Sequence, residues 1–171
     1  MTWPCFVRKR NRLPRSCYVG QNWYFITACT GDHRPLFSRG QLVQTLLDTL
    51  RAKCRSCSFN VYAYCFMPDH AHLELVGLSG TSDLIVMLRD FKGVATARVR
   101  AIGVRNLWEK SFYDHILREH DDHNGAAWYI FNNPVRKGLV KDPRDWQYSG
   151  SWMFDWKKVV APVGEYVPSW K

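Results

Sequence analysis

The spacing of hydrophobic residues along the chain changes between the period of a strand and the period of a helix. Residues 17–30 are rich in aromatic and β-branched side chains and end at Gly31, which predicts a strand followed by a turn. Leucine and valine then recur at spacings of three and four across residues 38–55. This spacing predicts an amphipathic helix, and Ser38 is placed to cap it.

The middle of the chain predicts two neighbouring strands and a second helix. Residues 59–67 indicate a largely buried strand, which Pro68 interrupts. Residues 70–76 then alternate polar and apolar side chains, as a second strand does when one face packs on a core. Residues 81–102 place apolar side chains on one helical face and basic side chains away from it.

The remaining pattern completes one α+β domain. Residues 107–117 have strand composition, and residues 120–133 predict a helix that ends before Pro134. The order β-α-β-β-α-β-α is the ferredoxin-like, split β-α-β arrangement. We therefore expect an antiparallel sheet with its two main helices on one face and an added C-terminal helix.

Composition indicates a single globular domain that needs no disulfides. The 171 residues are 46% hydrophobic and 23% charged, close to the average of folded proteins. The longest apolar run, residues 61–67, is too short to cross a membrane, and no apolar stretch follows the basic N-terminus as in a secretory signal. We expect a cytoplasmic location with reduced thiols. Cys54 and Cys57 form one C-x-x-C pair, but no second pair follows to complete a zinc site.

Charge indicates an acidic partner. The net charge is +9, and residues 1–17 contribute five basic side chains and no acid. Such an arm suits the phosphate backbone of a nucleic acid, although a solvated tail has the same composition. The sequence thus divides into a basic arm (residues 1–17), one domain (residues 18–151) and a tail (residues 152–171), which either covers the sheet edge or adds DNA-binding surface.

His70 and His72 are the first candidates for chemistry. Residues two apart in a strand share a face, so both imidazoles project together while Ala71, Leu73 and Leu75 point to the core. Two convergent imidazoles make half of a metal site. The pair alone also fits two surface histidines.

Tyr129 and Asn133 are the second candidates. They are four residues apart in the predicted last helix, so a phenol and a carboxamide share one face. The amide oxygen is a possible third metal ligand. A core tyrosine with its hydroxyl at the rim, and an asparagine that ends a helix, are the alternative interpretations.

Three strings of this sequence, taken together, resemble one family. They are MPDHAH at residues 67–72, FYDHILR at residues 112–118 and YIFNNPVRKGLV at residues 129–140. In this order and spacing they resemble the single-tyrosine HUH transposases, and among them the REP-associated tyrosine transposases. The resemblance covers residues 18–151, including DWQYSGS at residues 145–151.

The resemblance implies a role for each candidate. His70 and His72 would be metal ligands, Tyr129 the nucleophile and Asn133 the third protein ligand, with Mg²⁺ or Mn²⁺ as the metal. Insertion-sequence relatives often have glutamine at the Asn133 position, and asparagine keeps its amide oxygen on a shorter stem. His115 also resembles a family position, but the residues assign it no role beyond a buried hydrogen bond.

A tyrosine nucleophile requires help at neutral pH. Its ordinary pKa is about 10, so the phosphate must be polarised and the phenol must lose its proton. Attack on DNA would release a 3′-hydroxyl and leave a 5′-phosphotyrosine, whose reversal rejoins strands without ATP. The sequence has no GxxxxGK[ST] string, and we expect no nucleotide cofactor.

The expected substrate is single-stranded or hairpin DNA, because a site on a sheet surface does not reach a stacked, paired phosphate. The resemblance implies REP-like palindromes. Either a monomer or a homodimer is compatible with the sequence. Candidate phosphate contacts, which could equally be solvated surface, are Arg8, Lys9, Arg10, Arg12, Arg15, Arg89, Lys92, Arg98 and Arg100.

Three functions fit these observations. The first is an enzyme that nicks single-stranded DNA and transfers strands with the help of a metal. The second is a non-catalytic DNA-binding regulator on the same fold, in which Tyr129 is only structural. The third is a metal-dependent hydrolase that uses water. A covalent product distinguishes the first from the other two.

Overall fold

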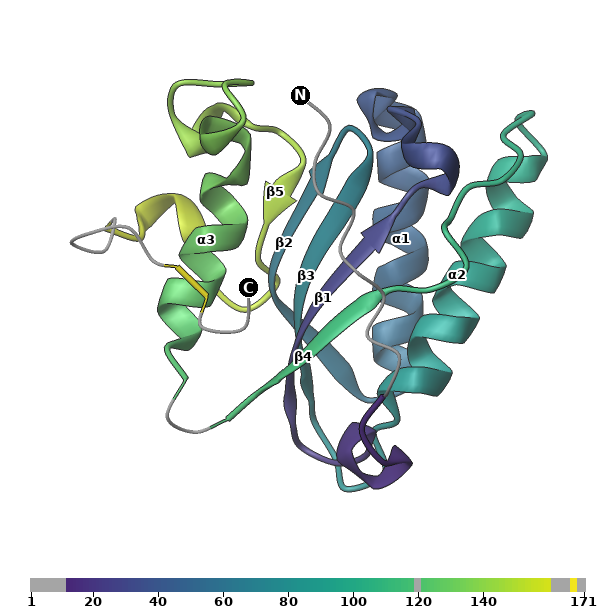
Figure 1. Cartoon of the computed structure of the whole chain (residues 1–171), viewed down its shortest axis with the longest axis vertical. Coiled ribbons are helices and arrows are strands. Elements are labelled where there is room, and N and C mark those ends of the chain that lie inside the picture. The colour runs from purple at the N-terminus through teal and green to yellow at the C-terminus, as the bar shows by residue number, and fades with distance from the viewer. Residues whose placement is uncertain (1–11, 119–120, 161–166, 169–171) are drawn as a thin grey trace.

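The helices and strands follow one another in the predicted order, with one further short strand near the end of the chain. The computed structural model describes residues 12–118, 121–160 and 167–168. In Figure 1 the elements run as β1 (Trp23–Cys29), α1 (Gly40–Ser56), β2 (Phe59–Met67), β3 (His70–Gly77), α2 (Leu84–Arg100), β4 (Tyr113–Leu117), α3 (His123–Arg136) and β5 (Ser149–Gly150). The order β-α-β-β-α-β-α is therefore confirmed, and β5 is the strand that the hydrophobic pattern does not predict.

The strands form one antiparallel sheet with β3 at its centre. The order across the sheet is β4-β1-β3-β2-β5, and each neighbouring pair is antiparallel. The register places His72 of β3 between Thr27 of β1 and Cys65 of β2. An antiparallel sheet with packed helices confirms the predicted α+β fold. Its central strand carries the candidate metal ligands.

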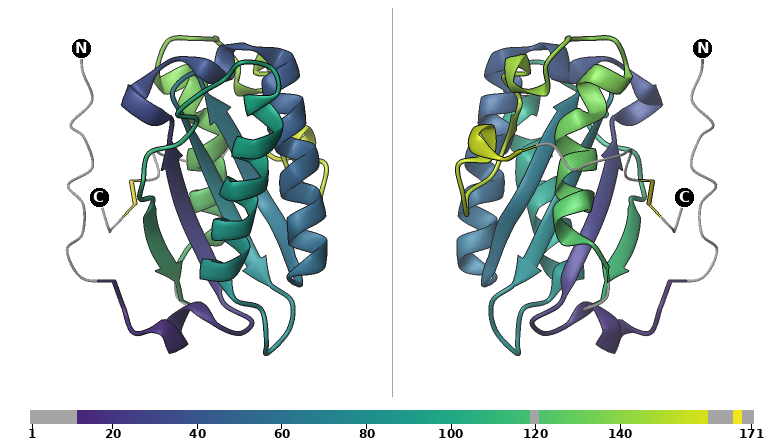
Figure 2. Two further views of the ribbon diagram at one scale, coloured as in Figure 1. Left: turned by 90° about the vertical axis from the view of Figure 1, so that its right-hand side faces the viewer. Right: turned by 90° about the vertical axis from the view of Figure 1, so that its left-hand side faces the viewer.

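Different helices cover the two faces of the sheet. Figures 1 and 2 show α1 and α2 against one face and α3 against the other. Successive residues of a strand point to opposite faces, and Leu73 of β3 belongs to the core beneath α1 and α2. Phe25 of β1 and Cys65 of β2 belong to the core beneath α3. His70 and His72 alternate with the apolar residues of β3, so they face α3.

The first half of the strand predicted over residues 107–117 is not a strand. Trp108 is buried in the main core, and only an isolated bridge joins it to the end of β1. Nζ of Lys92 donates a hydrogen bond of 2.6 Å to the carbonyl oxygen of Glu109. The side chain of Lys92 thus takes the place of the neighbouring strand as the hydrogen-bond partner of this backbone carbonyl. The strand β4 begins only at Tyr113.

The first strand and the first helix also begin later than predicted. The first strand was predicted over residues 17–30, but Gly20 adopts a φ of 110° and β1 starts at Trp23. Ser38 does not cap α1, because it lies in the preceding 3-10 turn and Arg39 takes the capping position without a side-chain hydrogen bond. Apolar spacing therefore locates these elements better than it locates their first residues.

Helix α3 continues past the proline that was expected to end it. The predicted end is Asn133, whereas α3 runs to Arg136 with Pro134 inside it. Pro134 belongs to the buried face of α3, so packing outweighs the one hydrogen bond that a proline removes. Gly138, with a φ of 68°, then leaves the helix in the left-handed conformation.

The described part of the tail packs on α3. Trp156 is 5% exposed, and its ring stacks on that of Phe131 with centroids 4.4 Å apart. Phe154 contacts both Phe131 and Tyr62 of β2. The backbone N–H of Trp152 also donates a hydrogen bond of 3.1 Å to the carbonyl oxygen of Val61 in β2, beyond the short β5. Of the two roles considered for the tail, these contacts provide a cover, over α3 and over this edge of the sheet.

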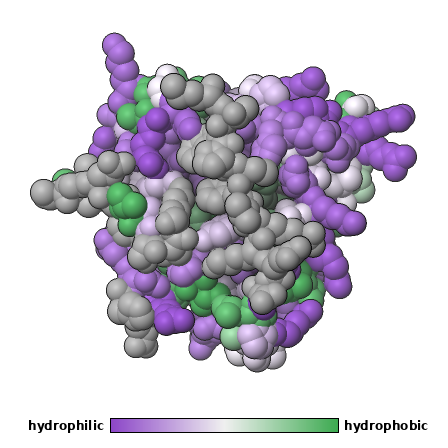
Figure 3. Space-filling model, viewed as in Figure 1, coloured by the Kyte–Doolittle hydropathy of each residue, from purple (hydrophilic) through white to green (hydrophobic). Residues whose placement is uncertain are grey.

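The described surface is mainly polar. Figure 3 shows hydrophilic side chains over much of the described part of one face, with smaller hydrophobic patches between them. Within residues 12–118, 121–160 and 167–168, no helix has both the length and the apolar character needed to cross a bilayer. The large apolar side chains are concentrated in the two cores on either side of the sheet.

Candidate active site

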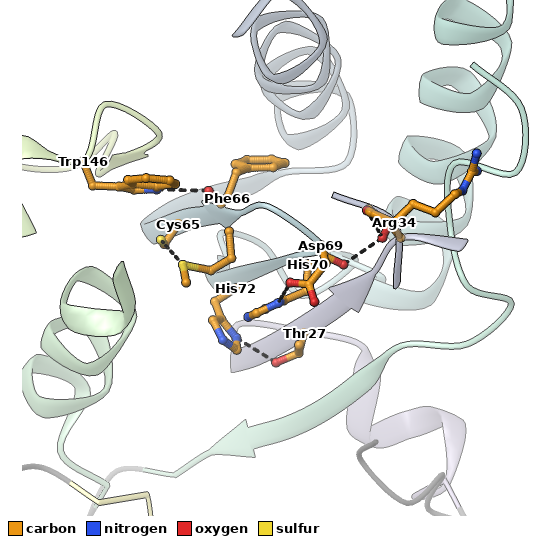
Figure 4. A network of polar contacts seen from close by, with 10 residues as sticks. Thr27, Arg34, Cys65, Phe66, Asp69, His70, His72 and Trp146 are labelled. Carbon is orange, nitrogen blue, oxygen red and sulfur yellow. Dashed lines mark hydrogen bonds and ion pairs between the residues drawn. The ribbon is translucent and has the colours of Figure 1, made fainter. Parts of the chain in front are cut away.

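The two histidines of the HAH string lie side by side on the α3 face of β3. Their ring centroids are 4.7 Å apart, and the rings are nearly perpendicular. His70 is 8% exposed and His72 is 2% exposed. Figure 4 shows both rings projecting from the same side of the strand. The two imidazoles therefore lie together, as predicted from the alternation of side chains along a strand.

A polar side chain orients each imidazole through its Nδ1 atom. Nδ1 of His70 lies 2.6 Å from Oδ1 of Asp69, and Nδ1 of His72 lies 2.8 Å from Oγ1 of Thr27, as drawn in Figure 4. The hydrogen bond with His70 lowers the pKa of Asp69. Metal-binding histidines are commonly held in this way, with one ring nitrogen on a carboxylate or other polar group and the second on the metal. The arrangement makes Nε2 the atom of each ring that could hold a metal.

Helix α3 brings Tyr129 to the same place. The ring of Tyr129 is 6.3 Å from that of His72 and 6.2 Å from that of Phe25, measured between centroids. Tyr129 is only 2% exposed. Ala126 and Ala127, one turn earlier, are also buried, and their small side chains let the helix backbone approach the sheet closely.

Asn133 lies one helical turn after Tyr129 and is 1% exposed. Its Nδ2 donates a hydrogen bond of 2.8 Å to the backbone carbonyl oxygen of Tyr129. Because the amide nitrogen is used within the helix, Oδ1 is the atom that can serve as a metal ligand. The structure thus gives Asn133 a definite orientation on the helix that carries Tyr129.

Two cations follow at the end of α3. The guanidinium carbon of Arg136 lies 4.6 Å from the centre of the Tyr129 ring. Partial desolvation and then the charge of Arg136 lower the pKa of Lys137, while Asp69 acts in the opposite direction. Arg136 thus places positive charge over the ring of the phenol, and Lys137 adds a second positive charge at the end of the helix.

Glu74 continues the row of polar side chains on β3 but lies away from solvent. It is 0% exposed, and its Oε1 lies 3.4 Å from Nδ1 of His123, the first residue of α3. Burial raises the pKa of Glu74 to about 7. The carboxylate therefore contacts the start of the helix that carries Tyr129.

The donor set fits a hard divalent cation. Two imidazoles and an amide oxygen leave positions for water and phosphate oxygens, which Mg²⁺ and Mn²⁺ accept. In the part of the chain that the structure describes, no three His, Cys, Asp or Glu side chains form a metal cluster. A cation at His70 and His72 would therefore depend on Asn133, water or the substrate for its other ligands.

The basic candidates are scattered over the molecule. Arg8, Lys9 and Arg10 lie outside the described residues. Arg12 stacks over Phe112, which packs against the core beneath α1 and α2, and Nζ of Lys92 lies 6.0 Å from the centre of the same ring. This contact is therefore on the face of the sheet opposite His70 and His72. Arg15 instead pairs with Asp83 at the start of α2.

The four basic candidates of α2 lie on the helix layer opposite α3. The exposed Arg89 pairs with Asp90, Lys92 donates to backbone carbonyls, and Arg98 donates to Oγ1 of Thr49 at 3.1 Å. Arg100 is exposed at the end of the helix. The structure does not bring these four side chains together with His70 and Tyr129.

Sequence reasoning missed three residues of the site. Asp69 directly precedes His70, so a carboxylate next to a candidate ligand was a usable signal. Arg136 is seven residues after Tyr129 and therefore on the same helical face. The contact of Thr27 with His72 could not be predicted from the sequence, because it depends on the pairing of β1 with β3.

Known proteins share this fold. The family described as "Transposase IS200 like" matches residues 18–130, which include His70, His72 and Tyr129. A REP-associated tyrosine transposase of Escherichia coli (strain K12) is 29% identical over 140 residues, which cover 79% of each chain. The solved structure of a REP-associated tyrosine transposase bound to a REP hairpin has a TM-score of 0.68 at 24% identity, over 92% of this chain and 98% of that one. The chain therefore belongs to the IS200-like transposase family, and it is an enzyme that cleaves and rejoins DNA.

Proposed function

We propose that this protein is a metal-dependent single-strand DNA endonuclease and strand transferase that uses Tyr129 as its nucleophile. One observation carries the proposal: two imidazoles held through Nδ1 lie beside the ring of a tyrosine from another element. A phenol alone is a weak nucleophile, so its position next to a candidate metal site is the arrangement that such chemistry needs.

The proposed step exchanges one phosphoester for another. The Oη atom of Tyr129 attacks the scissile phosphorus and loses its proton, the bond from phosphorus to the 3′-oxygen breaks, and that oxygen takes up a proton. The product is a 5′-phosphotyrosine and a 3′-hydroxyl, with no change in oxidation state. The reverse attack by another 3′-hydroxyl joins two strands and needs no nucleotide cofactor.

His70 and His72 would hold a divalent cation, Mg²⁺ or Mn²⁺, through Nε2, together with Oδ1 of Asn133. When bound, the cation supplies charge that polarises the scissile phosphate. Asp69 and Thr27 keep the two rings in place, and the apolar neighbours of Tyr129 keep water away from the phenol. Exclusion of water favours strand transfer over hydrolysis.

We propose hairpin DNA of the REP type, with a single-stranded segment at its foot, as the substrate. The solved relative that this fold resembles is bound to a REP hairpin. Arg12, which stacks over Phe112 on the α1 and α2 side of the sheet, is a proposed phosphate contact away from the histidines. Arg8, Lys9 and Arg10 remain proposed contacts of the same arm.

The experiment is a search for the covalent adduct. The protein is incubated with 5′- and 3′-labelled hairpin DNA in Mg²⁺, Mn²⁺ or EDTA, and the products are separated on a denaturing protein gel. We expect a metal-dependent adduct with the strand 3′ of the cut, which disappears in Tyr129→Phe. Tyr148→Phe is the matched control, because Tyr148 packs against the core on the opposite side of the sheet.

The outcomes separate the three functions considered. An adduct that survives Tyr129→Phe would overturn the assignment of the nucleophile. Cleavage without any adduct would indicate a water-using hydrolase. Binding of many hairpins with no cleavage in either metal would indicate a DNA-binding regulator.

A further inference from the structure

Arg136 lies at the proposed nucleophile, yet the chemistry described above gives it no task. Its guanidinium carbon is 4.6 Å from the centre of the Tyr129 ring. Arg136 is exposed, whereas Tyr129 is 2% exposed. The arginine is thus the solvent-side neighbour of a phenol whose other ring contacts, Phe25 and His72, are buried.

Three residues of α3 share one face by their spacing. Tyr129, Asn133 and Arg136 follow one another at intervals of four and three residues, which is the spacing of a single helical face. The first two are the proposed nucleophile and metal ligand. The third is therefore presented to the same substrate as they are.

A phosphodiester that reacts with Tyr129 comes within reach of this guanidinium. Reacting atoms lie about 3 to 3.5 Å apart before attack, so the phosphate must sit next to the ring that Arg136 covers. Because the exposed Arg136 lies over the ring of the buried Tyr129, DNA that approaches the phenol from this side meets the guanidinium first. An arginine displaced by a phosphate can keep contact with it, because the planar guanidinium binds two phosphate oxygens at once.

We propose that Arg136 is a further catalytic residue, which exchanges its contact with the Tyr129 ring for a nonbridging oxygen of the scissile phosphate. This inference rests on the proposed role of Tyr129. In the attack, charge builds up on the nonbridging oxygens, and the guanidinium adds a protein-borne positive charge to that of the metal. Lys137, the next residue, contributes to the same positive region.

The test removes the charge of one phosphate. Hairpin DNA is made with a methylphosphonate, which lacks one negative oxygen, at the scissile position, and its two stereoisomers are separated. Binding is measured in EDTA with the Tyr129→Phe protein, which keeps the ring but does not cleave. We expect at least one isomer to bind about tenfold more weakly than ordinary DNA, the size of a charge-assisted hydrogen bond.

The double variant Tyr129→Phe/Arg136→Ala should lose this discrimination and bind the ordinary and modified hairpins alike. Tyr129→Phe/Arg55→Ala is the matched control, because Arg55 is an exposed arginine of α1 on the opposite side of the sheet. It should discriminate as Tyr129→Phe does. Arg136→Lys should restore part of the discrimination, because lysine keeps the positive charge but does not bind two phosphate oxygens at once.

Single-turnover cleavage gives a second readout. Arg136→Ala should slow cleavage of ordinary DNA by about 100-fold while the amount of folded protein stays unchanged. Equal discrimination with and without Arg136 would overturn the inference, and so would an unchanged cleavage rate. Both results would leave the Tyr129 adduct intact, whereas a missing adduct in the unmodified protein would overturn the proposed function itself.

Discussion

The smallest unit of the site is one hydrogen bond between neighbouring strands. Oγ1 of Thr27 lies 2.8 Å from Nδ1 of His72, and both residues are 2% exposed. We expect Thr27→Val, which keeps the shape but removes the hydroxyl, to weaken metal binding by about 10- to 100-fold because the imidazole loses its orienting partner. The dependence of cleavage on Mn²⁺ concentration measures this effect.

A matched substitution separates orientation from stability. Thr49 of α1 is 1% exposed, and its hydroxyl donates a hydrogen bond of 2.7 Å to the carbonyl oxygen of Thr45. Thr49→Val should lower the free energy of unfolding by about 1 kcal/mol and leave the Mn²⁺ dependence unchanged. An equal shift of the Mn²⁺ dependence in both variants would contradict the role of Thr27.

Glu74 makes the stability of the protein depend on pH. Burial raises its pKa from 4.5 to about 7, so the folded protein holds this proton more tightly than the unfolded chain does. The resulting stability is fully present below pH 4.5 and is lost as the pH rises to about 7. Glu74→Gln, which carries no ionisable proton, should remove this dependence.

At pH 8 we expect Glu74→Gln to raise the free energy of unfolding by up to about 3 kcal/mol, at about 1.4 kcal/mol for each pH unit between the two pKa values. Urea denaturation in EDTA at pH 5 and pH 8 measures the difference while metal binding is excluded. A difference that does not change with pH would contradict the prediction.

At the scale of elements, α3 matters most because it carries Tyr129, Asn133 and Arg136. Its start is capped by Asp122, which accepts a hydrogen bond of 2.8 Å from the backbone N–H of Gly125. We expect Asp122→Ala to lower the free energy of unfolding by about 1 kcal/mol, the usual effect of losing such a cap. Urea denaturation and hydrogen exchange of the amides of the first turn of α3 measure it.

Asp122→Asn is the control for this cap. Asparagine keeps an acceptor for the N–H of Gly125 but loses the charge, so stability should stay within a few tenths of a kcal/mol of the unmodified protein. If Asn destabilises the protein as much as Ala, the charge of Asp122 and not its hydrogen bond would be responsible.

Elements were predictable where one physical signal dominated. Amphipathic spacing located α1 and α2, and alternation located β3 with its histidines, because both depend only on which face is buried. The end of α3 was wrong because Pro134 lies in its buried face, where packing overrides the local preference against helix. β5 was missed because two residues are too short for a pattern.

At the scale of the whole molecule, the chain itself brings the proposed nucleophile to the proposed metal site. The ring of Tyr129 lies 6.3 Å from that of His72 within one chain, and α3 packs directly on the sheet. The sequence left open whether the protein is a monomer or a homodimer, and in a homodimer the tyrosine of one subunit can serve the site of the other. The packing supports a site made within one subunit.

Mixing two inactive variants tests this arrangement. Tyr129→Phe lacks the nucleophile and His72→Ala lacks a ligand, so neither should form the adduct alone. If each subunit uses its own tyrosine, a mixture unfolded and refolded together should be as inactive as its parts. A dimer that exchanges α3 would instead recover about a quarter of the adduct, because half of the dimers would be mixed and each would contain one complete site. The packing of α3 on its own sheet, with Tyr129 buried against Phe25 and His72, leads us to expect no recovery.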